Sequence, residues 1–446
     1  MGKLFSRRFV VVLTTFLSLV AGVGCDLQFL LLPEPFPVPD IWYGVSTAAY
    51  QNEDSPAADD PYFFQTDWDL SYASGHIETS RGAGAYGYTE IEQYIAALKY
   101  LGVTHFRFGV EWARVEPRPD EINEAALEHY AHFARRLREE NIEPIVCLWH
   151  WTFPDWLANL DDPSMHGWLN PTTAEHWKTH VARVVARLAP YAQYYAPQNE
   201  PNVQTLAGYV VAVFPPHASF RFDLNDRNVD ASVAAFREAA RIVREQYAVT
   251  APPERPNPKI ISIDNLAAWQ NDPLDVLGLV SGYIKDQSYR HVDRVIDDVD
   301  IVGFTYYGRQ ISSIGGLTQR EPREGDQYSD IGIEIYPAGL AAAIAETYER
   351  FGKPMLIVEN GIADASDSRR PVYLKAHINA VRIALEQGYP ILGYMHWSLV
   401  DNYEWQDGYG PKFGLFTLDS ATRALVPRGS AEVYRELIAA RGGHLP

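Results

Sequence analysis

The sequence predicts an α/β fold, a closed (β/α)8 TIM barrel, and three observations support this prediction. From residue 41 to about residue 440, short apolar segments alternate with amphipathic helical stretches. The apolar segments rarely contain alternating polar residues, which is typical of parallel strands buried on both faces. Their number, eight, is the number of strands that closes such a barrel. We expect the strands at residues 42–47, 104–109, 145–149, 194–199, 260–263, 301–305, 355–359 and 393–397.

An open, doubly wound sheet is the alternative fold, but no G-x-G-x-x-G pattern follows the first strand. The chain has 446 residues, enough for about three average domains, yet α/β barrels run longer than that as one unit. We therefore expect a single barrel domain over residues 41–440. Loop insertions, among them the long polar stretch 308–336, are expected to form part of the wall of a functional site.

The amino terminus has the pattern of an export signal. Three basic residues within the first eight precede an apolar run over residues 9–23, which ends at the small-residue pattern Gly22-Val23-Gly24. The run is shorter than the ~20 residues that a membrane-spanning helix needs. We expect residues 1–24 to be a signal peptide or membrane anchor, Cys25 to be a lipidation site, and residues 25–40 to be a proline-rich linker. The protein is then periplasmic, extracellular or anchored to a membrane by its N-terminus.

Helix boundaries follow from capping residues. Thr89 and Thr172 each precede a glutamate by three positions, which predicts a capping box at the start of a helix. Gly102 and Gly352 follow the last apolar residue of two amphipathic stretches and predict helix ends.

Composition and charge exclude several kinds of partner. Lys and Arg total 38 and Asp and Glu total 57, so the formal charge is 38 − 57 = −19. This excess disfavours nucleic acid and anionic membrane surfaces, because both attract basic patches. Two cysteines, Cys25 and Cys147, are too few for a disulfide framework or a cysteine-rich zinc site. We expect a small neutral or cationic ligand and no cofactor or metal, and the sequence does not indicate the oligomeric state.

Polar and aromatic residues stand at the ends of the expected strands, so a barrel brings them to one mouth. Alone, Arg107 would be a structural ion-pair partner and His150 a core histidine. Together they indicate a site, because a buried strand end crowded with polar groups is costly unless it is used. These residues are Gln51, Arg107, His150, Trp151, Asn199, Glu200, Tyr307, Glu359 and Trp397.

Two of them, Glu200 and Glu359, end the fourth and seventh strands. Glycoside hydrolysis needs one protonated and one ionised carboxyl group on either side of the scissile bond. Two neighbouring carboxylates resist double ionisation, which separates their pKa values. Arg107 and Tyr307 would keep Glu359 ionised, and Glu200 would then keep its proton. We expect a bell-shaped pH profile with a mildly acidic optimum.

Asn199-Glu200-Pro201 and Ile357-Val358-Glu359-Asn360-Gly361 resemble the two catalytic signatures of the family 1 glycoside hydrolases, the β-glucosidase family. The likeness covers about residues 40–436, in order. It implies a retaining β-glycosidase that hydrolyses β-glucosides or related β-glycosides by double displacement. Glu359 would be the nucleophile, and Glu200 the acid and then the base.

The same resemblance implies the residues that bind the carbohydrate substrate. The block Trp397–Trp405 resembles the family's sugar-binding loop, with Trp397 as a stacking floor. Glu404 can accept from two hydroxyl groups, and Asn199 can donate to the 2-hydroxyl. A glutamate at position 404 makes a phosphorylated sugar unfavourable. The implied substrate-binding set is Gln51, His150, Trp151, Asn199, Trp397, Glu404 and Trp405.

The chain departs from the family pattern at three places near the expected site. Thr305 stands where the family usually has Asn, Gln198 where it has a hydrophobic or aromatic residue, and residues 80–88 lack the usual acidic and histidine pattern. These changes bear on aglycone choice and rate rather than on reaction class, and glucose, galactose and fucose are not distinguished.

Three other functions are alternatives to that of a retaining glycosidase. A transglycosidase would use the same glycosyl-enzyme, and an inactive relative would only bind sugar. A metal-dependent hydrolase is disfavoured, because His150 has no partner at ligand spacing and His166 and His176 are expected at the surface.

Overall fold

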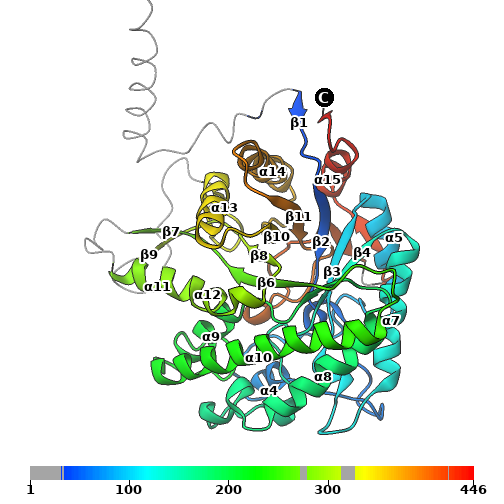
Figure 1. Ribbon diagram of the computed structural model, residues 1–446, viewed down its shortest axis with the longest axis vertical. Coiled ribbons are helices and arrows are strands. Elements are labelled where there is room, and N and C mark those ends of the chain that lie inside the picture. Colours follow the sequence, from blue (N-terminus) through cyan, green and yellow to red (C-terminus); the bar gives the residue numbers. More distant parts are fainter. Residues whose placement is uncertain (1–31, 33–34, 272–278, 313–326, 420, 446) are drawn as a thin grey trace, which may run out of the picture.

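The computed structural model describes residues 32, 35–271, 279–312, 327–419 and 421–445. Its centre is a closed barrel in the order β10-β11-β2-β3-β4-β5-β6-β8 (Figure 1). All eight strands pair in parallel. Each overlaps one expected strand, so the predicted (β/α)8 barrel is confirmed. The strands are β2 (Trp42–Ser46), β3 (His105–Gly109), β4 (Glu143–Cys147), β5 (Tyr194–Ala196), β6 (Lys259–Asn265), β8 (Ile301–Thr305), β10 (Met355–Asn360) and β11 (Ile391–Trp397).

Apolar side chains fill the barrel interior, so the barrel is a packed core and not a pore. They come from alternate strand positions, because successive side chains of a strand point to opposite faces. Ile261 and Ile263 are one such pair, and Leu356 and Val358 are another. The intervening residues of these strands, such as Ile260 and Ile357, belong to the larger cluster beneath the helices.

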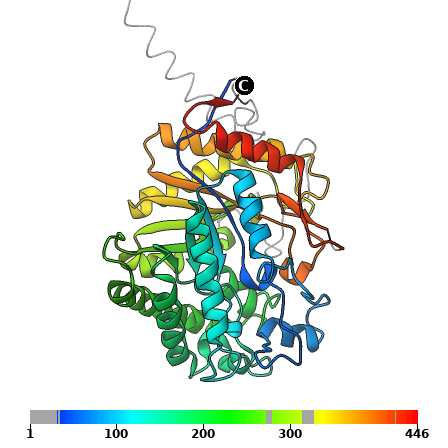
Figure 2. The same cartoon turned by 90° about the vertical axis from the view of Figure 1, so that its right-hand side faces the viewer.

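Long helices form the outer layer around this barrel (Figure 2). Short helices stand in the loops that follow strands, among them α3 (Ala49–Asn52), α4 (Asp67–Ala73), α6 (Trp112–Val115), α9 (Pro201–Tyr209) and α12 (Val292–Val295). The long ones are α5 (Ile91–Leu101), α7 (Glu124–Glu139), α8 (Thr173–Leu188), α10 (Phe222–Thr250), α11 (Leu279–Arg290), α13 (Pro337–Phe351), α14 (Arg370–Glu386) and α15 (Gly429–Ala439).

The predicted helix ends are correct. Gly102 and Gly352 follow α5 and α13 with φ of 73° and 62°. This left-handed conformation suits glycine, which has no Cβ to clash with the following carbonyl.

The two predicted capping boxes are wrong. The N-cap of α5 is Glu90, one residue after Thr89, and the Thr89 hydroxyl donates instead to Asp54 at 3.2 Å. Thr172 is the N-cap of α8, but its hydroxyl donates to Asn170 Oδ1 at 2.9 Å. In both cases a side-chain oxygen nearby competes with the helix backbone for the hydroxyl.

The two ends of the described chain meet in a small sheet. β1 (Phe36–Pro37) pairs antiparallel with β14 (His444–Leu445), and the C-terminus lies beside β1 in Figure 1. The last part of the expected linker, residues 25–40, thus contributes a strand. Residues 1–24 and Cys25 lie outside the described residues. Within the described ranges, no helix has both the length and the apolarity to cross a membrane.

Two further strand pairs lie outside the barrel. β12 (Phe416–Leu418) pairs antiparallel with β13 (Leu425–Pro427), and β7 (Ala268–Asn271) runs parallel to β9 (Arg309–Ser312). The stretch 308–336, expected to be a loop, therefore begins with a strand.

Candidate active site

Two glutamates face one cavity at the carboxyl ends of the barrel strands. Glu200 follows β5 and begins α9, and Glu359 is the penultimate residue of β10. Each is 3% exposed. Both line a cavity of about 260 Å³. Because they stand on strands far apart in the sequence, only the closed barrel brings them to the same cavity.

Glu200 is held through one of its two carboxyl oxygens. Thr305 Oγ1 and Asn265 Nδ2 both donate to Oε1, the amide at 3.0 Å, and Asn265 also donates to Thr305 at 2.9 Å. Burial, and then the charge of Glu359, raise the pKa of Glu200 to about 8. Glu200 therefore keeps a proton at neutral pH. Since Oε1 accepts both hydrogen bonds, the proton resides on Oε2.

Glu359 has a different environment, because donors occupy both of its oxygens. Arg107 Nη1 forms an ion pair with Oε1, and the Tyr307 hydroxyl donates to Oε2 at 2.6 Å. Burial and the charge of Glu359 raise the pKa of Tyr307 well above its ordinary value, so the phenol remains a donor. A carboxylate can accept all of these bonds, whereas a carboxylic acid would direct its own proton at one of the donors.

Arg107 also contacts His150, which lines the cavity. Arg107 Nη2 donates to Asn199 Oδ1 at 2.7 Å and lies 2.9 Å from His150 Nδ1. An arginine has no acceptor, so Nδ1 accepts in this contact, while Nε2 lies 3.1 Å from the Asn199 amide nitrogen. Burial, and then the charge of Arg107, lower the pKa of His150 well below its ordinary value. His150 is therefore a neutral imidazole at the edge of the cavity.

Glu404 stands on the polar side of the same cavity. Trp397 Nε1 donates to its Oε1 at 3.3 Å, and Gln51 Nε2 donates to its Oε2 at 3.4 Å. Burial raises the pKa of Glu404 to about 8. Trp405 completes this wall with its ring centroid 5.8 Å from that of His150. The wall offers donors and acceptors for sugar hydroxyls next to aromatic faces for C–H groups.

Backbone strain gathers at this cavity. Trp151, Glu200 and Trp405 have φ of 67°, 40° and 52°, which is the left-handed region that non-glycine residues rarely adopt. Such residues cost about 1–3 kcal/mol each and persist only where the surroundings enforce them. The rings of Trp151 and Trp405 pack against each other, with centroids 5.1 Å apart, and this packing helps to hold both residues in the left-handed conformation. All three side chains line the cavity.

The structure brings together nearly all the residues expected at the site. Arg107 and Asn199 do not line the cavity but support its wall from behind, fully buried. Cys25 lies outside the described residues. The expected residues that line the cavity are Gln51, His150, Trp151, Glu200, Tyr307, Glu359, Trp397, Glu404 and Trp405.

Sequence reasoning missed other lining residues. Asn265 ends β6, but the expected fifth strand stopped at residue 263, so its strand-end position was not recognised. Val203 and Phe214 also line the cavity, and so do Ile331 and Ile333, which belong to the stretch 308–336 that was expected to wall a site. They are apolar residues outside any motif, and no local pattern distinguishes them from core residues.

The departures from the family pattern have different structural roles. Thr305 contacts Glu200 directly. Gln198 does not line the cavity; it exchanges hydrogen bonds with Ser232 of α10, at 3.1 Å and 2.9 Å. Gln198 thus anchors the end of β5 to the outer layer.

His166 is not at the surface as expected. It is fully buried, with Nε2 3.3 Å from Asp67 Oδ2. A tertiary contact buries it, and nothing in the local sequence shows that contact. His176 lies with Glu116 and Asp120 in a trio whose ligand atoms are within 4.8 Å of one another, away from the cavity that holds the two glutamates.

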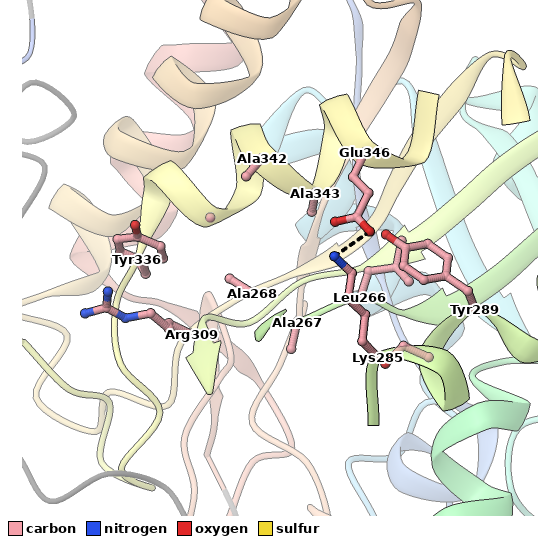
Figure 3. A pocket seen from close by; sticks show the side chains of 12 residues that line it. Leu266, Ala267, Ala268, Lys285, Tyr289, Arg309, Tyr336, Ala342, Ala343 and Glu346 are labelled. Atoms are coloured by element: carbon pink, nitrogen blue, oxygen red, sulfur yellow. Dashed lines mark ion pairs between the residues drawn. The ribbon is translucent and has the colours of Figure 1, made fainter. Parts of the chain in front are cut away.

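A second cavity, of about 280 Å³, lies outside the barrel between α11 and α13 (Figure 3). Its walls are mainly small apolar residues such as Ala268 and Ala343. Among its charged groups, Lys285 and Glu346 neutralise each other in an ion pair at 2.8 Å, and Arg309 pairs with Glu334. It brings no pair of carboxyl groups together, so the carboxylate chemistry belongs to the barrel mouth.

The barrel mouth holds one protonated carboxyl group and one whose two oxygens both accept hydrogen bonds, and both lie beside a wall of polar groups. This arrangement is typical of the class of glycoside hydrolases. The protein is an enzyme of this class. Comparison by sequence specifies the family: the profile of glycosyl hydrolase family 1 matches residues 32–249 and 283–443, and the chain belongs to that family.

Characterised relatives extend over most of the chain. A β-galactosidase of Sulfolobus acidocaldarius is 30% identical over 90% of this chain and 94% of its own length. β-Glucosidase A of Thermotoga maritima is 26% identical over 91% of this chain and 98% of its own. A chloroplastic galactolipid galactosyltransferase of Arabidopsis thaliana is 26% identical over 89% of this chain and 63% of its own. The crystal structure of a β-glucosidase from Pyrococcus furiosus superposes with a TM-score of 0.78 at 26% identity, covering 92% and 96% of the two chains.

Proposed function

We propose that the protein is a retaining β-glycosidase that hydrolyses β-glucosides or related β-glycosides by double displacement, with Glu359 as nucleophile and Glu200 as acid and base. The observation that supports these roles is the contrast between two carboxyl groups on one cavity. Glu200 has a pKa raised to about 8 and a free oxygen for its proton. Glu359 accepts from donors at both oxygens.

In the first step a Glu359 oxygen bonds to the anomeric carbon while the glycosidic C–O bond breaks. Glu200 gives its proton to the departing oxygen, so the aglycone leaves as a neutral alcohol. In the second step Glu200, now ionised, takes a proton from water, and the resulting hydroxide equivalent displaces Glu359. Arg107 and Tyr307 hold Glu359 in place throughout, so neither carboxylate oxygen has to reorient.

The polar wall would bind the glycone. Glu404 and the Gln51 oxygen Oε1, which accepts no hydrogen bond within the described residues, can accept from neighbouring sugar hydroxyls. The relatives named for β-glucosidase and β-galactosidase activity support these two glycones as the first to be tested. A panel of nitrophenyl β-glycosides checks them: a higher kcat/KM on α- than on β-glycosides would contradict the proposal.

The nucleophile assignment predicts the effect of Glu359→Gln. An amide cannot form the glycosyl-enzyme, so kcat on nitrophenyl β-glucoside should fall by about 10³-fold or more. Glu200→Gln is the matched control: its kcat/KM, which reports the first step, should fall much less, because this activated leaving group departs without a proton. Near-normal turnover by Glu359→Gln would show that another group attacks, and an inactive wild-type protein that still binds sugar would indicate a binding relative.

A transglycosidase is the second candidate. The relative named as a galactolipid galactosyltransferase supports it, since a galactosyltransferase transfers a galactosyl group to an acceptor. Chromatography of the products at high acceptor concentration separates the two functions: hydrolysis gives free monosaccharide, and transfer gives a longer glycoside.

Export remains part of the proposal. The basic and apolar pattern of residues 1–24 supports a signal peptide or anchor, and Cys25 supports lipidation and membrane tethering. Mass spectrometry of the mature N-terminus tests this, and an unmodified Met1 on the recovered protein would contradict it.

A further inference from the structure

We propose that Asn202 is a positioning residue for the acid of the reaction. It binds both backbone groups of Asn265 and so holds in place the side-chain amide that orients the Glu200 carboxyl group. This inference rests on the proposed function, because it concerns the proton that Glu200 gives to the leaving group. Asn202 does not line the cavity and comes after the Asn199-Glu200-Pro201 motif, so neither the cavity nor the motif identifies it.

The side-chain amide of Asn202 bonds to three backbone groups. Nδ2 donates to the Asn265 carbonyl at 3.0 Å and to the Ser288 carbonyl at 3.2 Å, while Oδ1 accepts from the Asn265 N–H at 3.2 Å. The pattern at Asn265 is that of two paired residues in a sheet, which exchange both of their hydrogen bonds. One amide group thus fixes where the Asn265 backbone lies and how it is turned.

Asn202 takes the place of a strand partner for the end of β6. The neighbouring strand β5 is short, and its pairing with β6 stops at Ile260. Further along the same edge of β6, the Ile263 carbonyl accepts from the Glu200 N–H at 2.8 Å. In a parallel ladder the backbone groups of alternate residues face the same edge, so Asn265 is the next residue to face α9. Asn202 binds it there, and the end of β6 is held although β5 does not reach it.

The helix that carries Asn202 is itself anchored. α9 packs against β6 and α11 (Figure 1). On the α10 side, the buried Asn228 amide donates to Gln204 Oε1 at 3.1 Å and to Thr205 Oγ1 at 2.9 Å, both on α9. The bond from Asn202 to the Ser288 carbonyl fixes its amide to α11 as well. Asn202 therefore stands on a fixed support and imposes a position on Asn265.

Through Asn265 this support reaches the acid. The Asn265 side chain donates to Glu200 Oε1 at 3.0 Å and to Thr305 Oγ1 at 2.9 Å. A turn of the Asn265 backbone would withdraw both bonds. The Glu200 carboxyl group could then rotate about its last bond, and the proton on Oε2 would point at the departing oxygen for only part of the time. Loss of Asn202 should therefore weaken proton donation, because that step depends on orientation.

The test compares kcat/KM for two β-glycosides of one glycone in Asn202→Ala. The leaving oxygen of a methyl glycoside needs the proton of Glu200, whereas dinitrophenolate departs without one. On the methyl glycoside we expect a fall of about tenfold, which is part of the roughly 10²–10⁴-fold that a positioned acid contributes. On the dinitrophenyl glycoside the fall should be no more than about twofold, because the acid contributes little there. The alkaline limb should also move to higher pH, because the bond from Asn265 lowers the pKa of Glu200.

A second variant tests the route through Asn265. Asn265→Ala keeps the backbone groups that Asn202 binds and removes the amide that reaches Glu200, so it should show the same selective loss. Asn202→Ala/Asn265→Ala should lose no more than Asn265→Ala alone, because both changes remove one effect. Gln193→Ala is the matched control. It removes an amide that donates to the Asn257 carbonyl at 3.0 Å, at the amino end of β5, and it should leave the ratio of the two kcat/KM values unchanged.

Each contrary result has its own meaning. Equal losses on both glycosides in Asn202→Ala would indicate a general structural role and overturn the inference, and so would losses that add up in the double variant. If Asn202→Ala does not fold, Asn202→Ser replaces it in both comparisons, since a serine hydroxyl is too short to bridge Asn265 and Ser288. Equal losses on both glycosides in Glu200→Gln would instead refute the acid of the proposed function, and the inference with it.

Discussion

At the scale of single residues, Thr305 controls the acid that the reaction depends on. Its hydroxyl donates to Glu200 Oε1 and accepts from Asn265. A hydrogen bond to the carboxylate form lowers the pKa of Glu200 against the rise caused by burial and by Glu359. Thr305 therefore sets how far above neutrality Glu200 stays protonated.

We predict that the wild-type kcat/KM falls as the pH rises through about 8, where Glu200 loses its proton. This value places the alkaline limb, and the mildly acidic optimum expected from sequence would lie below it. Thr305→Val removes the donor, so the pKa of Glu200 rises and the alkaline limb moves to higher pH. Thr305→Ser keeps the hydroxyl and should keep the limb in place. pH–rate profiles check this, and an identical limb in the Val variant would refute the role of Thr305.

Sequence could identify site residues only where they belong to motifs or strand ends. Glu200 and Glu359 satisfy both conditions. Val203 and Ile331 satisfy neither, because their role arises from the loops that fold over the barrel mouth. Asn265 was missed through a strand end placed two residues early.

At the scale of elements, the ends of β10 and β11 must approach closely for Glu359 and Trp397 to share a cavity. Gly361 follows β10, and a Cβ built there would overlap the Trp397 carbonyl, a backbone group that cannot move aside. The glycine is required by packing between the strand ends.

We predict that Gly361→Ala lowers the free energy of unfolding by about 1–3 kcal/mol, as for other overpacked sites. It should also lower kcat by displacing Glu359. Gly282→Ala is the matched control: a Cβ there meets nothing within 4 Å, in the exposed part of α11. That change should stabilise by about 0.5–1 kcal/mol. Urea unfolding measures both, and an unaffected Gly361→Ala would contradict the close approach.

Strands were predictable as elements because a buried parallel strand has a short, continuous apolar run. The starts of helices were harder to predict from sequence. Thr89 and Thr172 have the right spacing for a capping box, but Asp54 and Asn170 take their hydroxyls. Local spacing cannot reveal a competing acceptor that is 35 residues away along the chain.

At the scale of the whole molecule, the site lowers stability at alkaline pH. The pKa values of Glu200 and Glu404 are both raised to about 8 by burial. In the unfolded chain each would lose its proton near its ordinary value of 4.5. Between these values the folded state binds more protons than the unfolded state, so the free energy of unfolding falls as the pH rises.

We predict a decline of at most about 1.4 kcal/mol per pH unit and per group between pH 5 and 8. Glu200→Gln and Glu404→Gln should each reduce this slope, because an amide does not ionise. Urea unfolding at several pH values provides the measurement. A wild-type slope that neither variant reduces would show that these carboxyl groups do not carry the effect.

The pairing of β1 with β14 has a practical consequence for handling the enzyme. β1 directly precedes β2, so the small sheet lies at the amino ends of the strands, whereas Glu200 and Glu359 stand at their carboxyl ends. A tag or surface linkage attached at either end of the described chain would therefore emerge on one side. Immobilised through that side, the barrel would present its open mouth to the bulk solution.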